Sequence, residues 1–120
     1  MINQDACDFY GDAHAVYPEF GGVVLSDEEG AKLAECLGPK GKALILQNHG
    51  LLTVGQTVDE ATYLYTLMER SCEVQLLVDA AAEGSGKAKK FASDQACEFT
   101  FKAVSDPVSL KILWYNDPCC

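Results

Sequence analysis

Two histidines, His14 and His49, are the side chains in this sequence best suited to metal or acid–base chemistry. Imidazole is the commonest metal ligand, and it changes its protonation state near neutral pH. His49 is the stronger candidate because it stands between an apolar run and Gly50. This places an imidazole at a strand end, where open α/β sheets bind ligands. The alternative interpretation is a structural histidine that hydrogen-bonds a backbone carbonyl group.

Other reactive side chains have structural interpretations. Glu69 and Glu73 stand one helical turn apart, with Arg70 beside Glu69, and such acids are predicted to be solvated. The six cysteines form no CxxC pair and no export signal opens the chain, so reduced thiols are predicted. The GSGK sequence at residues 84–87 lacks the preceding strand and full glycine spacing of a phosphate loop, and it is interpreted as a linker.

Capping motifs predict where the helices begin. Ser26 and Thr57 each precede a glutamate by three residues, which is the spacing of a capping box. The first helix is predicted over residues 27–37, because Gly38-Pro39 follows it. The second runs to about residue 82, and a third begins near residue 93. The predicted apolar stripe of the second helix consists of Val58, Ala61, Leu64, Tyr65, Met68, Cys72, Leu76 and Val78.

Strand-like segments flank His49. Residues 43–46, Ala-Leu-Ile-Leu, form a continuous apolar run that predicts a strand buried on both faces. Residues 51–54 are also rich in β-favouring side chains, so the polar residues between the two segments are predicted to lie at a sheet edge. Residues 7–20 are predicted as a loop and 23–25 as a short strand. Residues 109–115 fit either a helical turn or a strand.

The charge balance and the chain opening exclude several kinds of partner. Eighteen acidic against nine basic side chains give a formal net charge of −9, which repels nucleic acid and anionic lipid. No apolar run approaches the ~18 residues that a membrane-spanning helix needs. We therefore expect no nucleic-acid partner and no membrane segment, and a cytoplasmic location follows by default.

A longer motif resembles the class II aldolase/adducin family. It is QNHGLLTVGQTVDEATYLYTLMERSCEVQLLVDAAA, at residues 47–82, and the upstream DFYGDAHAVYPEFGGVVLSDEEG also resembles fungal and bacterial members. The most specific part is NHG followed by TVG and then by TVDEA. The resemblance covers residues 5–107 and leaves 108–120 as a divergent tail. It corresponds to the C-terminal half of the family domain.

The resemblance implies a role for His49. In the family, the histidine of the HG turn is the third ligand of a divalent metal, usually zinc. The family's other two metal histidines belong to an HxH motif, and both this motif and the acid/base carboxylate would lie upstream of Met1. A catalytic zinc needs three protein ligands, so we expect no stable zinc binding by this chain alone and assign no catalytic residue. His14 lies in a stretch that the family does not use for ligation.

The resemblance also implies the fold and the mode of assembly. We expect an α/β chain with a partial class II aldolase-like three-layer fold, in which helices flank a short central sheet. Residues 1–120 would form a single partial domain. An incomplete sheet has open edges, which predicts a homo-oligomer or a complementing chain as partner.

Two functions stay open from the sequence. The first is a protein related to metal-dependent aldolases or epimerases of small sugar phosphates, truncated and catalytically incomplete as given. The second is a non-catalytic, adducin-like binding or scaffold domain. A third idea is a degenerate remnant with no independent function. The substrate is not determined by the sequence.

Overall fold

A small mixed sheet forms the centre of the fold. The computed structural model describes residues 1–19 and 26–104. Its strands are β1 (His14–Tyr17), β2 (Ala43–Leu46) and β3 (Gly50–Thr53), in the order β1-β2-β3. β1 runs parallel to β2, with His14 opposite Ala43, whereas β3 returns antiparallel to β2 with Gly50 opposite Leu46. The predicted apolar strand is confirmed, because Ala43 and Leu44 point to opposite faces and both are fully buried.

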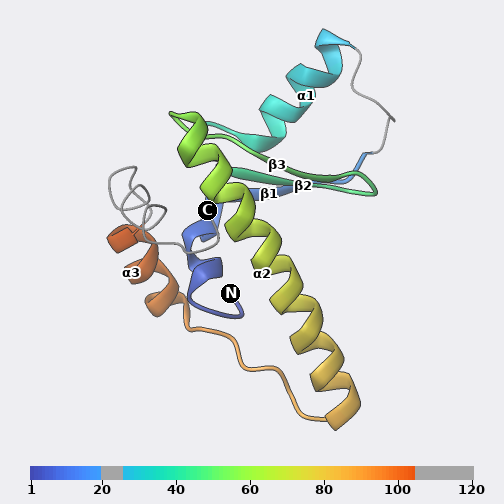
Figure 1. Cartoon of the computed structure of the whole chain (residues 1–120), viewed down its shortest axis with the longest axis vertical. Coiled ribbons are helices and arrows are strands. Elements are labelled where there is room, and N and C mark those ends of the chain that lie inside the picture. Colours follow the sequence, from blue (N-terminus) through green and yellow to red (C-terminus); the bar gives the residue numbers. More distant parts are fainter. Residues whose placement is uncertain (20–25, 105–120) are drawn as a thin grey trace.

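Helices cover both faces of this sheet, which confirms the three-layer α/β prediction (Figure 1). α1 (Asp27–Leu37) contacts β1 and β2, and α2 (Val58–Ser85) contacts β2 and β3 from the other side. α3 (Asp94–Val104) packs against the 3-10 helix η1 (Asp5–Phe9), and a second 3-10 helix, η2 (Gly11–Ala13), leads into β1. Among the described residues, no helix is long and apolar enough to cross a lipid bilayer.

Local capping sets the helix boundaries as predicted. The Ser26 hydroxyl accepts a hydrogen bond from the Glu29 amide at 3.3 Å, and the Thr57 hydroxyl accepts from the Glu60 amide at 3.1 Å. These bonds satisfy amides that have no partner within the helix. The Glu60 carboxylate accepts from the amide of Gln56, one residue before the cap, at 2.7 Å. α2 extends three residues beyond the predicted end at residue 82.

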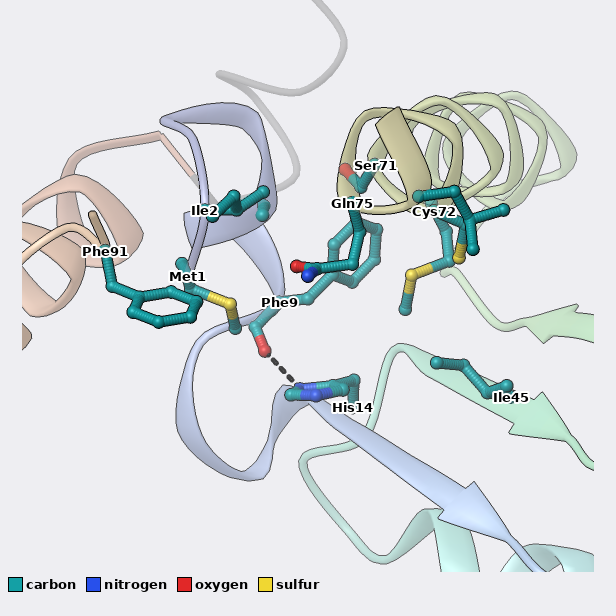
Figure 2. A pocket seen from close by; sticks show the side chains of 12 residues that line it. Met1, Ile2, Phe9, His14, Ile45, Ser71, Cys72, Gln75 and Phe91 are labelled. Atoms are coloured by element: carbon teal, nitrogen blue, oxygen red, sulfur yellow. Dashed lines mark hydrogen bonds between the residues drawn. The ribbon is translucent and has the colours of Figure 1, made fainter. Parts of the chain in front are cut away.

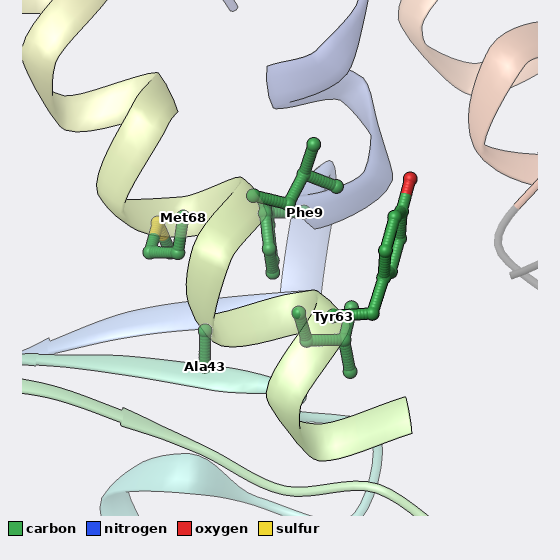
Figure 3. Close-up of a cluster of buried hydrophobic side chains, with 6 residues drawn as sticks. Phe9, Ala43, Tyr63 and Met68 are labelled. Atoms are coloured by element: carbon green, nitrogen blue, oxygen red, sulfur yellow. The ribbon is translucent and has the colours of Figure 1, made fainter. Parts of the chain in front are cut away.

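The hydrophobic core lies between α2, η1 and the sheet (Figure 3). Its buried members are Phe9, Ala43, Tyr63, Leu64, Leu67 and Met68. The predicted stripe of α2 is therefore partly wrong. Leu64 and Met68 are buried, but Val58 and Leu76 are 82% and 70% exposed, and Tyr63 and Leu67 complete the buried face. α2 meets the rest of the chain through its first half, and none of its residues after Ser71 is buried.

The prediction of a loop over residues 7–20 is wrong for most of that segment. It contains the end of η1, all of η2 and the strand β1. β1 forms by pairing with β2, whose residues are 29 positions further along the chain, and this non-local pairing leaves no strong local signature. The predicted strand at 23–25 and the undecided segment at 109–115 lie outside the described residues.

Candidate functional site at the QNHG turn

The QNHG residues form the tight connection between β2 and β3. Because Leu46 pairs with Gly50, the loop consists of Gln47, Asn48 and His49. The amide of His49 donates to the Leu46 carbonyl oxygen at 3.0 Å and closes the turn. Asn48 has a φ of 59°, in the left-handed region that asparagine tolerates better than most residues. The sequence Asn-His-Gly therefore folds into a compact turn that holds His49 at the end of β2.

This turn is solvent-exposed, as the sequence predicted for polar residues at a sheet edge. Gln47, Asn48 and His49 are all exposed. Gly50 has a φ of 153°, a backbone conformation that L side chains rarely adopt. The residues on both sides of His49 have positive φ values, which few residue types adopt without strain. The shape of the turn therefore depends on asparagine at position 48 and glycine at position 50. His49 is thereby positioned by Asn48 and Gly50 and by the strands on either side.

The second histidine lies at the other end of the sheet. His14 is the first residue of β1, and its Nδ1 lies 2.6 Å from the Phe9 carbonyl oxygen. Because β1 and β2 are parallel and His14 pairs with Ala43, His14 lies beside the start of β2. His49, in contrast, follows the end of β2. Four strand residues rise by roughly 10 Å, so the two imidazoles are too far apart to share one metal ion.

The described residues do not complete a zinc site. Among residues 1–19 and 26–104, no group of three or more His, Cys, Asp or Glu side chains is close enough to hold a metal ion. A catalytic zinc takes three protein ligands and keeps one position open. His49 has the right chemistry for one of these ligands, but the described side chains around it do not provide the other two.

The acidic pair on α2 lies on the surface of the helix. Glu69 and Glu73 are both exposed, which confirms their interpretation as solvated side chains.

A buried carboxyl group lies on η1, where Asp8 is only 4% exposed. Burial raises the pKa of Asp8 to about 6, against the attraction of Lys42, which lowers it. No sequence signal marked Asp8, because the 3-10 helix that buries it has no distinctive pattern.

Two buried thiols meet beside this carboxyl group. Cys7 on η1 and Cys97 on α3 lie with their sulfur atoms 3.4 Å apart. Burial and the neighbouring Cys97 raise the pKa of the Cys7 thiol to about 11, which keeps it protonated at neutral pH. The pair therefore contributes to the packing of α3 on η1 and is poorly suited to nucleophilic chemistry.

Comparison with known proteins gives this arrangement its context. The fission yeast Schizosaccharomyces pombe has a relative, meiotically up-regulated gene 14 protein, that is 49% identical over 83 residues, which are 69% of this chain and 32% of the relative. Decarboxylase NovR of Streptomyces niveus is 46% identical over 82 residues, 68% of this chain and 30% of that protein. The chain therefore spans about a third of the length of these curated relatives.

The fold is shared with a solved aldolase. The structure of L-fuculose 1-phosphate aldolase from Glaciozyma antarctica PI12 matches with a TM-score of 0.75 and 36% identity, over 95% of this chain and 39% of that one. Residues 1–76 match the family described as Class II Aldolase and Adducin N-terminal domain. The β2–β3 turn, the capped α2 helix and the three-layer arrangement thus belong to a known family: this chain is a member of the class II aldolase and adducin N-terminal domain family.

Proposed function

We propose that this chain acts by association: it is a class II aldolase/adducin-type module that joins another polypeptide, either a second copy or a complementing chain, to form the functional unit. The observation that carries the proposal is the sheet itself. In the described part of the chain, β1 and β3 each pair with β2 only, so neither has a second strand beside it; on β1 the Val16 carbonyl oxygen accepts from the Cys36 thiol at 3.6 Å. Open edges present unpaired amides and carbonyl groups that favour pairing with a further strand.

Exposed apolar side chains on several elements support this proposal. Val16 on the edge strand β1 is 55% exposed, and Leu76 and Leu77 on the second half of α2 are 70% and 63% exposed. α1 has no buried residue although it covers one face of the sheet. Surfaces of this kind are typical of contacts between polypeptides.

The second candidate function is a metal-dependent aldolase or epimerase of small sugar phosphates. The observation that favours it is the exposed His49, held between Asn48 and Gly50, both of which have positive φ values. In such an assembly His49 would supply one zinc ligand, and groups outside the described residues would supply the others. The adducin-like alternative is an assembly of the same shape in which no metal binds and the contact with the partner is itself the function.

Sedimentation velocity of matched variants tests the association. Val16→Lys places a charged side chain on the edge strand β1, and Val58→Lys makes the same change at the first residue of α2, which is 82% exposed. Edge lysines oppose strand pairing. We expect the unmodified chain and the Val58→Lys variant to form dimers or larger species, and Val16→Lys to shift towards monomer. Each of the three proteins is first measured alone. A tagged form of the chain is then mixed with a cell extract and purified again, to recover any complementing polypeptide that binds it. A monodisperse monomer that recovers no polypeptide would contradict the proposal.

Zinc content of the isolated assembly then separates the two candidates. The aldolase candidate predicts bound zinc that is lost in His49→Ala and retained in Glu73→Ala, a matched change at an exposed potential ligand on α2. The scaffold candidate predicts the same assembly with no zinc in any variant. Zinc retained in His49→Ala would refute the role of His49.

A further inference from the structure

A cavity separate from the QNHG turn lies over the start of β1. It has a volume of about 430 Å³ and is bounded by η1, α2, the sheet, the first residues of the chain and the segment before α3. In Figure 2, Phe9 and Met1 line its centre, with His14 below and Gln75 above. α2 contacts β2 and β3, and this leaves room for the cavity above β1. A volume of this size is in the range of small-molecule sites.

The walls of the cavity are held together by specific contacts. The amide of Ala92 donates to the Met1 carbonyl oxygen at 2.9 Å, and this bond fixes the start of the chain to the segment before α3. On the same segment, the Lys89 ammonium group lies 2.9 Å from an Asp79 carboxylate oxygen on α2 and 5.9 Å from the centre of the Phe91 ring. The segment that carries Phe91 is thus tied to α2 by the Lys89–Asp79 ion pair and to the start of the chain by the Ala92–Met1 hydrogen bond.

The polar groups of the lining are mainly hydrogen-bond acceptors. The Phe9 carbonyl oxygen can only accept, so the hydrogen of the neutral His14 ring is on Nδ1 and its Nε2 is an acceptor. Gln75 donates one N–H of its amide group to Asp79 at 2.7 Å, which leaves its carbonyl oxygen as an acceptor and its second N–H as a donor. The Ser71 hydroxyl donates to the Leu67 carbonyl oxygen at 2.8 Å, so its oxygen can also accept. A hydroxyl group on a ligand would therefore find acceptors on His14, Gln75 and Ser71.

The rest of the lining is mostly apolar and disfavours ionised ligands. It consists of apolar side chains such as Ile2, Phe9, Ile45 and Met68, and none of the described lining side chains is a lysine, arginine, aspartate or glutamate. An ionised carboxylate or phosphate would lose its hydration, and no lining side chain would offer it a positive charge, although Met1 also brings its α-amino group to the lining. The formal net charge of −9 adds repulsion for anions.

From this geometry we propose that the cavity binds a neutral, apolar molecule that carries a hydroxyl group, of the phenol or hydrophobic alcohol class, with the hydroxyl donating to His14 Nε2. The ring or alkyl part packs against Phe9 and Met68. This site is distinct from the QNHG turn, because His14 and His49 lie at opposite ends of the sheet. The proposal requires no bound metal, but it does require the cavity to stay open, and Leu76 belongs both to its lining and to the exposed apolar surface offered above for association.

Three probes with the same ring system test the chemistry: 1-naphthol, naphthalene and 1-naphthoate. Each is titrated into the untagged full-length chain and followed by ligand fluorescence. We expect 1-naphthol to bind about 2- to 10-fold more tightly than naphthalene, which is the contribution of one net hydrogen bond. We expect 1-naphthoate to bind more weakly than 1-naphthol, because its carboxylate loses hydration in a mostly apolar lining. Equal or tighter binding of 1-naphthoate, or no binding of 1-naphthol, would overturn the proposal.

Two readouts locate the binding to the cavity. In the unmodified chain labelled with nitrogen-15 histidine, 1-naphthol is expected to shift His14 Nε2 and to leave His49 unchanged. Cys72→Phe fills part of the cavity and is expected to weaken 1-naphthol binding at least 10-fold. The matched change Cys36→Phe, at a half-buried cysteine on α1, is expected to leave it unchanged. Equal effects of the two variants, or a cavity closed to 1-naphthol by association of two copies, would contradict the proposal.

Discussion

Replacement of the buried carboxyl group of Asp8 with an amide tests the electrostatics of the η1 packing. Asp8 is 4% exposed, and burial raises its pKa from 3.8 to about 6. The neighbouring Asp5 also raises this pKa, whereas Lys42 lowers it. Asp8→Asn keeps the shape of the side chain and removes the ionisation. We expect this variant to be more stable than the unmodified chain at neutral pH and similar to it in acid.

The sign and magnitude follow from proton linkage. A carboxyl group whose pKa is higher in the folded state binds more protons when folded, so the free energy of unfolding falls as pH rises from about 4 to 6. Above pH 6 the full effect is present. A rise of the pKa from 3.8 to about 6 corresponds to about 3 kcal/mol, which is the upper bound for the gain in Asp8→Asn at pH 7 to 8.

Urea unfolding at several pH values measures this difference. The free energies of unfolding of Asp8→Asn and the unmodified chain are compared at pH 4, 5, 6, 7 and 8, followed by circular dichroism. Asp12→Asn is the matched control, because the Asp12 carboxylate is exposed and lies 3.9 Å from Lys40 in a surface ion pair. The control is expected to change stability by less than about 1 kcal/mol at any of these pH values. A difference for Asp8→Asn that does not change with pH would refute the reasoning.

Three further predictions concern packing, capping and thiol reactivity. Leu64→Ala removes a fully buried side chain and is expected to lower the free energy of unfolding by about 2–5 kcal/mol, whereas Val58→Ala at an exposed site should change it by less than about 0.5 kcal/mol in urea titrations. Thr57→Ala removes the cap of α2 and should cost about 1 kcal/mol, and Thr62→Ala, whose hydroxyl bonds only within the helix, should cost less. Because burial raises the pKa of Cys7 to about 11, iodoacetamide at pH 8 should modify it at least ~10-fold more slowly in the folded than in the urea-unfolded chain, as followed by peptide mass spectrometry. Equal rates would show that this thiol is not protected by the fold.

Features coded by a few adjacent residues could be predicted from the sequence. The Ser26 and Thr57 caps place the starts of α1 and α2, because each is a bond between a hydroxyl group and an amide three residues later. The apolar residues 43–46 form β2, and the polar residues after them form an exposed turn. The same turn carried the resemblance that the family comparison confirms. The assignment of His49 to a metal stays a prediction.

The two histidines show what the sequence could not determine. Their spacing does not reveal that one starts β1 and the other follows β2, since this depends on parallel pairing of strands that are far apart in the chain. The sequence treated His14 as a loop residue, whereas the structure places it against a cavity formed by segments that are far apart in the chain. A site of this kind has no local motif because its members are adjacent only after folding.

The sequence alone therefore determined the helix caps, the apolar strand, the QNHG turn and the family, because each depends on interactions within a short stretch of chain. Only the tertiary structure decided which face of α2 is buried, where β1 forms and why Asp8 is desolvated. These features depend on contacts between residues that are distant in sequence. Such contacts are selected by the packing of whole elements, and no single segment encodes them.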